Sequence, residues 1–277
     1  SGDAFDALYY LLSKRLARAK RTVVDATNVR FEDRKKLLQH ARKYHCFAVA
    51  IVVDTPERVC HERNATRPDR QFGPQVIHRQ YAELRRSIRN LEREGFRFVY
   101  IVRPGDEVEI VSVPAWNNKK HETGPFDIIG DVHGCAPELR ILLSNLGYER
   151  TEAPHDSPWG GDLWRHPHGR RAIFVGDLVD RGPEILNTLR IVRNMMHAGA
   201  AFCVSGNHDV KLVRWLRGKK LQIKHGLQRS IDEIEPLDST DRSRIAAFLD
   251  GLLSHYVFDG GKLVVAHAGL REEMHGR

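Results

Sequence analysis

Four short polar segments in the second half of the sequence carry side chains of the types that bind divalent metal ions. They are GDVHG (130–134), GDLVDRG (176–182), GNHD (206–209) and VVAHAGL (264–270). Together they supply carboxylate, imidazole and amide ligands from Asp131, His133, Asp177, Asn207 and His267. This mixture of oxygen and nitrogen ligands suits a pair of divalent cations bridged by a carboxylate. We therefore expect a two-metal site that activates water for attack on phosphorus.

The five ligands divide between two ions. Asp177 is the expected bridge, Asp131 and His133 would complete the first shell, and Asn207 and His267 would serve the second ion. Because the ligands are oxygen and imidazole nitrogen and not thiolate, Mn²⁺ is the expected metal, with Ni²⁺ or Fe as alternatives.

Three further residues complete the expected catalytic set. Arg181 would hold a phosphate group in its guanidinium fork. His208 would protonate the leaving alkoxide, with Asp180 orienting its imidazole, and Asp209 is expected only as a helix cap. Each motif alone occurs by chance in loops, and a lone histidine after an apolar strand is often a packed core residue. Four such segments in this order favour one shared site.

An apolar run precedes each polar segment and predicts a strand. The runs are FDII (126–129), RAIFV (171–175), AAFCVS (200–205) and KLVVA (262–266). Loops that follow the carboxyl ends of neighbouring strands converge at one edge of a sheet. The predicted strands would therefore bring the four segments together.

The first half alternates between helical and strand patterns. Helices are expected over 4–19 and 34–44, after Pro56 and along an arginine-rich stretch, with strands over 21–26, 46–54 and 96–102. This order predicts an α/β unit whose parallel sheet is covered on both faces. We predict one domain over 1–103, an extended, proline-interrupted linker over 104–125, and a second domain over 126–277.

Two groups in this half suit phosphate chemistry. Asp25 and Asn28 lie at the carboxyl end of the strand expected over 21–26, where open α/β sheets bind ligands, although turn residues would look the same. Arg63, Arg67 and Arg70 would line a lid over a transferring phosphoryl group. The arginines from position 85 onward are interpreted as a solvated face, ion-paired with Glu83, Glu92 and Glu94. No G-x-x-x-x-G-K-[ST] phosphate-binding loop occurs in the 277 residues.

Composition limits the possible partners and location. The net charge of +8 favours a polyanionic partner, and the four cysteines form no C-x-x-C pair. No apolar stretch approaches the length of a membrane span, and no apolar signal core is present, so a cytoplasmic location is expected.

The series GDVHG…GDLVDRGP…GNHD…HAGL resembles the calcineurin-type metallophosphoesterases over most of residues 126–277. This resemblance implies an αββα sandwich with a binuclear metal centre and the ligand roles given above. Protein phosphatases of the family usually have HGGL where this chain has HAGL. The family also supplies a later metal-ligand histidine from a GHT-like segment, which we expect to lie beyond residue 277.

With the first half included, the sequence resembles the bacterial polynucleotide kinase-phosphatases of RNA repair. That resemblance implies a P-loop kinase using ATP and Mg²⁺ on 5′-OH ends, joined to a phosphatase that removes 3′-phosphate or 2′,3′-cyclic phosphate from RNA, or from DNA. It also implies a ligase-like module and an RNA 3′-end methyltransferase as partners. We then expect an internal fragment: a partial P-loop kinase-like sheet lacking its Walker A loop, followed by a partial αββα sandwich.

Two alternatives remain open. The same ligand set serves phosphoprotein phosphatases and dinucleoside tetraphosphate hydrolases, so the substrate could differ while the enzyme class is kept. A catalytically silent RNA-binding module is the other alternative, and it predicts salt-sensitive RNA binding without Mn²⁺-dependent turnover.

Overall fold

The computed structural model describes residues 2–111, 113–152 and 159–276. They form two compact units, one extending to Val113 and one from Pro114 to Gly276. In both units helices pack against parallel strands, which confirms the predicted α/β class. No helix among the described residues is both long and apolar enough to cross a lipid bilayer.

The first unit is built on a two-stranded parallel sheet in which Val49 of β1 pairs with Phe98 of β2. Its elements are α1 (Gly2–Ala17), α2 (Phe31–Lys43), β1 (Val49–Val53), α3 (Glu57–Ala65), α4 (Pro74–Ser87), η1 (Ile88–Asn90), α5 (Leu91–Glu94) and β2 (Phe98–Val102). The arginine-rich helix expected as one long element is therefore α4, η1 and α5 in succession.

Two expectations for this sheet were wrong. Residues 21–26 form no strand, because the segment pairs with neither described strand and Val23 is 83% exposed. The sheet is also not covered on both faces: Val49, Ile51 and Val53 alternate along β1, and all three are exposed. β-Propensity made residues 21–26 a plausible strand, but a strand also needs a partner that supplies hydrogen bonds.

A buried ion pair joins α2 to α5. Arg34 donates from Nε and Nη2 to the two carboxylate oxygens of Glu94 at 2.8 and 2.6 Å, and from Nη1 to the Asn28 carbonyl at 2.9 Å. The expected ion pair of Glu94 with an arginine of its own helix is therefore replaced by a pair with Arg34 of α2. Both side chains are less than a tenth exposed, so the pair is shielded from water.

The second unit contains two three-stranded sheets with strand orders β4-β7-β8 and β10-β9-β3, and a two-stranded sheet of β5 and β6. Its elements are β3 (Asn118–Lys119), β4 (Phe126–Ile129), α6 (Ala136–Asn145), β5 (Glu149–Glu152), β6 (Asp162–Arg165), β7 (Arg171–Phe174), α7 (Ile185–His197), β8 (Ala201–Cys203), α8 (Asn207–Leu216), α9 (Leu227–Ile234), α10 (Ser239–Asp250), β9 (His255–Phe258), η2 (Asp259–Gly261), β10 (Leu263–Ala266) and η3 (Glu272–Met274).

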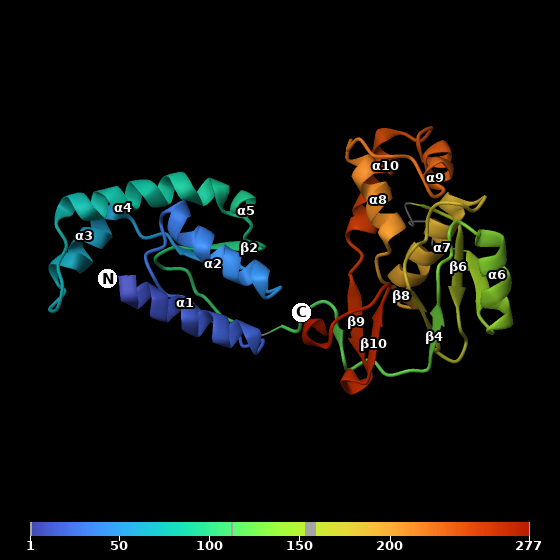
Figure 1. The fold of residues 1–277 in the computed structure, drawn as a ribbon, viewed down its shortest axis with the longest axis horizontal. Helices are drawn as coiled ribbons and strands as arrows, with labels where there is room; N and C mark the ends of the chain where they lie inside the picture. Colours follow the sequence, from blue (N-terminus) through green and yellow to red (C-terminus); the bar gives the residue numbers. More distant parts are fainter. Residues whose placement is uncertain (1, 112, 153–158, 277) are drawn as a thin grey trace. The chain divides into compact units, whose positions relative to one another are not determined.

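The two larger sheets pack face to face, with helices on the outer face of β4-β7-β8 (Figure 1). Side chains of β7 alternate between these layers: Ile173 packs with Tyr256 and Phe258 of β9, whereas Phe174 packs with α6 and α7. This gives the helix, sheet, sheet order of the predicted sandwich. The segment expected as a linker also contributes, since β3 pairs with β9 through Asn118 and Val257.

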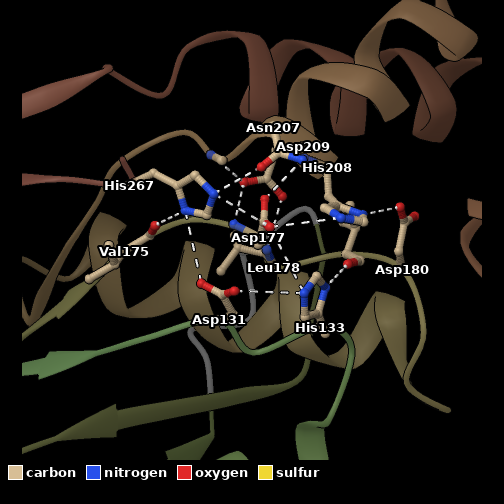
Figure 2. A network of polar contacts seen from close by, with 12 residues as sticks. Asp131, His133, Val175, Asp177, Leu178, Asp180, Asn207, His208, Asp209 and His267 are labelled. Carbon is tan, nitrogen blue, oxygen red and sulfur yellow. Dashed lines mark hydrogen bonds and ion pairs between the residues drawn. The ribbon is translucent and has the colours of Figure 1, made fainter. Parts of the chain in front are cut away.

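The strands that precede the polar segments are confirmed as β4, β7, β8 and β10. The first three are parallel neighbours, so the loops after them meet at one edge of the sheet. β10 belongs to the facing sheet, and its carboxyl end brings His267 to the same place (Figure 2).

Candidate two-metal centre

Three imidazole nitrogens converge on one carboxylate oxygen (Figure 2). Oδ2 of Asp177 lies 3.9 Å from Nε2 of His133, 3.9 Å from Nε2 of His208 and 3.5 Å from Nε2 of His267. The Asp177 side chain is only 5% exposed. A buried carboxylate at the centre of several nitrogen ligands has the position required of a group shared by two ions.

Backbone carbonyls set the orientation of two of these rings. Nδ1 of His133 donates to the Val179 carbonyl at 2.8 Å, and Nδ1 of His267 donates to the Val175 carbonyl at 2.7 Å. In the neutral ring the opposite nitrogen, Nε2, then carries the lone pair. Metal-bound histidines are commonly oriented in this way.

The donor atoms fit divalent cations. Among the described residues, Nε2 of His133 is buried without a hydrogen-bond partner, a cost that a bound cation would remove. Nε2 of His267 lies 3.0 Å from the amide oxygen of Asn207, and its Nδ1 lies 3.9 Å from a carboxylate oxygen of Asp131. The described residues thus offer two sets of donor atoms, and within each set the atoms lie within 4.8 Å of one another. One set comes from His133, Asp177 and His208, and the other from Asp131, Asp177 and His267.

The backbone around the centre is held in an uncommon conformation. His133, Asp177, Asp180 and Arg181 all have positive φ, between 46° and 72°. Residues other than glycine adopt this region at a cost, which the surrounding contacts must offset. Gly206 is needed for a different reason, because a Cβ there would collide with Oδ1 and the backbone nitrogen of Asp177.

Asp209 does more than the expected helix cap. Its carboxylate accepts the N–H of Gly206 at the start of α8, at 2.9 Å, and also those of Asp177 and Leu178, at 3.0 Å each. It thus joins the GDLVDRG and GNHD segments. Burial raises the pKa of Asp209 to about 6, although the three N–H donors favour the ionised form.

A hydrogen-bonded chain leads away from His208. Its Nδ1 donates to Oδ2 of Asp180 at 2.6 Å. The other carboxylate oxygen of Asp180 accepts the hydroxyl of Ser230 at 2.6 Å, and Ser230 Oγ accepts the Asp180 N–H at 2.9 Å. Ser230 was not among the predicted residues, because it lies 50 residues after Asp180 in helix α9 and belongs to no recognisable motif.

Arg181 is the residue after Asp180 in the sequence, and its side chain is exposed. Gly226, which precedes α9, packs closely on it: a Cβ at Gly226 would lie 2.7 Å from Cγ of Arg181. The loop that ends at Gly226 is thereby placed beside the residue expected to hold phosphate.

The residues expected to bind phosphate in the first unit lie on two separate segments of the chain. Arg63 lies in the last turn of α3, whereas Arg67 and Arg70 lie in the following loop; all three are exposed. Arg70 stacks over the ring of Phe72, 4.7 Å from its centroid. Asp25 lies within the segment 21–26, which is not a strand, and Asn28 follows it. The Asn28 carbonyl accepts a hydrogen bond from Arg34.

Comparison with known proteins agrees with this geometry. Residues 124–275, more than half of the chain, match the calcineurin-like phosphoesterase family, and residues 2–91 match an AAA domain. The sandwich and its histidine and aspartate centre therefore define a metallophosphoesterase. The chain belongs to the calcineurin-like phosphoesterase family, whose members bind divalent metals.

The chain also matches curated relatives over about half of its length. The chain is 42% identical over 152 residues to the asymmetrical bis(5′-nucleosyl)-tetraphosphatase PrpE of Halalkalibacterium halodurans, covering 53% of this chain and 58% of the relative. It is 38% identical over 156 residues to PrpE of Anoxybacillus flavithermus, covering 55% and 60%. The chain thus spans about three-fifths of these relatives' length. Their name is that of a tetraphosphatase, whereas the sequence had suggested a polynucleotide kinase-phosphatase.

Proposed function

We propose that the second unit is a two-metal phosphohydrolase that acts on nucleotide substrates, with Mn²⁺ as the preferred ion and Ni²⁺ or Fe as substitutes. The observation that carries this proposal is the convergence of three Nε2 atoms on Oδ2 of Asp177. Asp177 would bridge the ions, His133 and Asp131 would hold one, and Asn207 and His267 the other. When bound, two such ions polarise phosphate oxygens and acidify a water molecule.

The remaining side chains would act on the substrate itself. Arg181 would bind the phosphate oxygens through its guanidinium group and neutralise charge in the transition state. His208 would donate a proton from Nε2 to the leaving oxygen. Asp180 would hold the ring by its bond to Nδ1 and stabilise the positive form of the imidazole.

A dinucleoside tetraphosphate, cleaved asymmetrically, is the first substrate proposed. The support is the identity of 42% and 38%, over about half of this chain, to relatives named for that activity. This hydrolysis breaks a phosphoanhydride, whose leaving group is already acidic. It therefore depends less on a proton from His208 than hydrolysis of an alkyl phosphate does.

RNA ends bearing 3′-phosphate or 2′,3′-cyclic phosphate are the second candidate. The AAA domain match ahead of the phosphoesterase unit favours this substrate, because it repeats the domain order of the kinase-phosphatases that the sequence resembles. The net charge of +8 also suits a nucleic acid. In this case ATP and Mg²⁺ would serve a kinase activity in the whole protein, with Arg63, Arg67 and Arg70 near the transferred phosphate.

One comparison tests both substrates. Phosphate release would be measured with Mn²⁺ on Ap4A, on a 3′-phosphorylated RNA and on a phosphoserine peptide. We expect turnover of a nucleotide substrate that Asp177→Asn abolishes, with Asp238→Asn, an exposed cap of α10, as the matched control. Mn²⁺-independent RNA binding without any turnover would contradict the proposal and favour the silent RNA-binding alternative. Preference for the peptide would contradict the assignment of nucleotide substrates.

A further inference from the structure

A hollow of about 570 Å³ lies between helix α8 and the loop over residues 217–226. We call it the α8 groove. Its walls include Asn207, Lys211 and Arg214 from the helix and Leu221, Lys224 and His225 from the loop. Because Asn207 is also a proposed metal ligand, the groove begins at the metal centre. Its volume is within the range of sites that enclose a small organic ligand.

Two cations of α8, Lys211 and Arg214, form a row that leads away from Asn207 at the metal centre. Lys211 is four residues after Asn207 and Arg214 is three residues after Lys211, so all three side chains share one face of the helix. With a rise of about 1.5 Å per residue, Lys211 and Arg214 lie about 6 and 10 Å along the axis from Asn207. This row is longer than a single phosphoryl group.

The groove is electropositive. Of the described residues that line it, none is acidic, whereas Arg214 and Lys224 are exposed and His225 is beside them. Cations without an opposing carboxylate attract the negative charge of a ligand. Leu221 and Val210 add apolar surface to the same walls.

Two contacts hold the loop in place. Nζ of Lys211 donates to the Lys224 carbonyl at 3.0 Å, which fastens the loop to α8. At its far end, the Gly226 carbonyl accepts the N–H of Arg181 at 3.4 Å, and Gly226 has a φ of +92° that favours glycine. The wall of the groove is therefore attached to the residue proposed to bind the scissile phosphate.

We infer that the α8 groove binds the part of the substrate that extends beyond the reacting phosphorus: a chain of further phosphate groups joined to a nucleoside. This inference rests on the proposed nucleotide phosphohydrolase function. Arg214 and Lys224 contact the distal phosphates, and Leu221 and Val210 contact the nucleoside. A phosphomonoester without further phosphates leaves the groove empty, so the groove selects nucleoside polyphosphates.

Binding to metal-free protein tests the groove without catalysis. The whole protein in EDTA would be titrated calorimetrically with adenosine 5′-tetraphosphate and with inorganic phosphate. In the double variant Arg214→Gln/Lys224→Gln we expect about a tenfold loss of tetraphosphate affinity, since two charge-assisted contacts disappear. Arg165→Gln/Lys262→Gln removes the same charge from exposed positions outside the groove and should change that affinity less than about twofold.

Kinetics then separates the two proposals. With Mn²⁺, the groove variant should raise KM for Ap4A and leave kcat/KM for p-nitrophenyl phosphate unchanged. If the wild-type protein hydrolyses neither of these substrates nor a 3′-phosphorylated RNA, the proposed function fails, while the metal-free titration still decides whether the groove binds polyphosphate. Equal tetraphosphate affinity in wild type and groove variant would overturn the inference. So would a variant that loses affinity for a 3′-phosphorylated oligonucleotide and keeps it for the tetraphosphate.

Discussion

The substitution Ser230→Ala tests whether a residue outside every motif supports the catalytic centre. Ser230 is fully buried, and its hydroxyl both donates to Oδ1 of Asp180 and accepts the Asp180 N–H. Alanine removes one oxygen atom and leaves the helix backbone unchanged. The variant therefore releases Asp180 on the side opposite His208.

The expected loss of stability follows from these two bonds. An N–H left buried without an acceptor costs about 1–3 kcal/mol, and a lost hydrogen bond to a charged group costs about 1.5–3 kcal/mol. The higher helix propensity of alanine offsets about 0.5 kcal/mol. We expect the free energy of unfolding of the second unit to fall by about 2–5 kcal/mol. We also expect kcat to fall about 10- to 100-fold, because Asp180 no longer holds His208 in one orientation.

Tryptophan fluorescence during urea unfolding measures the second unit alone, because all four tryptophans, at 116, 159, 164 and 215, lie within it. Ser243→Ala is the matched control: Ser243 is exposed in α10, and its hydroxyl only donates to the Ser239 carbonyl. We expect that control to stay within about 0.5 kcal/mol of wild type. If Ser230→Ala equals Ser243→Ala in both stability and kcat, the support assigned to Ser230 is refuted.

Three further predictions concern other parts of the chain. The His208→Asn variant should keep its metal content, measured by mass spectrometry, while its rate of hydrolysis of a 3′-phosphorylated RNA falls about 10²–10⁴-fold. Its rate of hydrolysis of p-nitrophenyl phosphate should fall less, because that leaving group needs no proton. Loss of metal from the variant would instead show that His208 is a metal ligand. Arg34→Met should destabilise the first unit by about 3–5 kcal/mol without moving the tryptophan transition, whereas Arg58→Met, in an exposed ion pair, should cost about 0.5 kcal/mol or less. Burial lowers the pKa of His255 from 6.5, and its Nε2 accepts a hydrogen bond from Asn117, so the folded state favours the neutral ring. Because the unfolded chain then binds the proton more readily, the free energy of unfolding should fall as the pH drops below 6.5. His255→Gln should flatten that slope in urea titrations, and equal slopes would contradict the assignment.

Much of the candidate site could be predicted from the sequence because its chemistry is local. Aspartate, histidine and asparagine side chains define the ligand types, and the apolar run before each segment defines a strand end. Parallel strands then bring their carboxyl ends to one edge whatever the details of packing. Asp131, His133, Asp177, Asn207 and His267 were predicted in this way, and the structure brings them together. Their individual roles remain predictions.

What only the tertiary structure decided depends on pairing between distant segments. Residues 21–26 have strand propensity, but no strand in the described part of the chain pairs with them, so the described sheet of the first unit has two strands. The carbonyls of Val175 and Val179 direct the Nε2 atoms of His267 and His133 toward Asp177, and a carbonyl's direction is not encoded by residue type. Ser230 and the α8 groove likewise result from a loop and a helix folding back onto Arg181 and α8. The sequence by itself therefore determined which atoms can bind metal, while packing decided where those atoms point and what surface lies beside them.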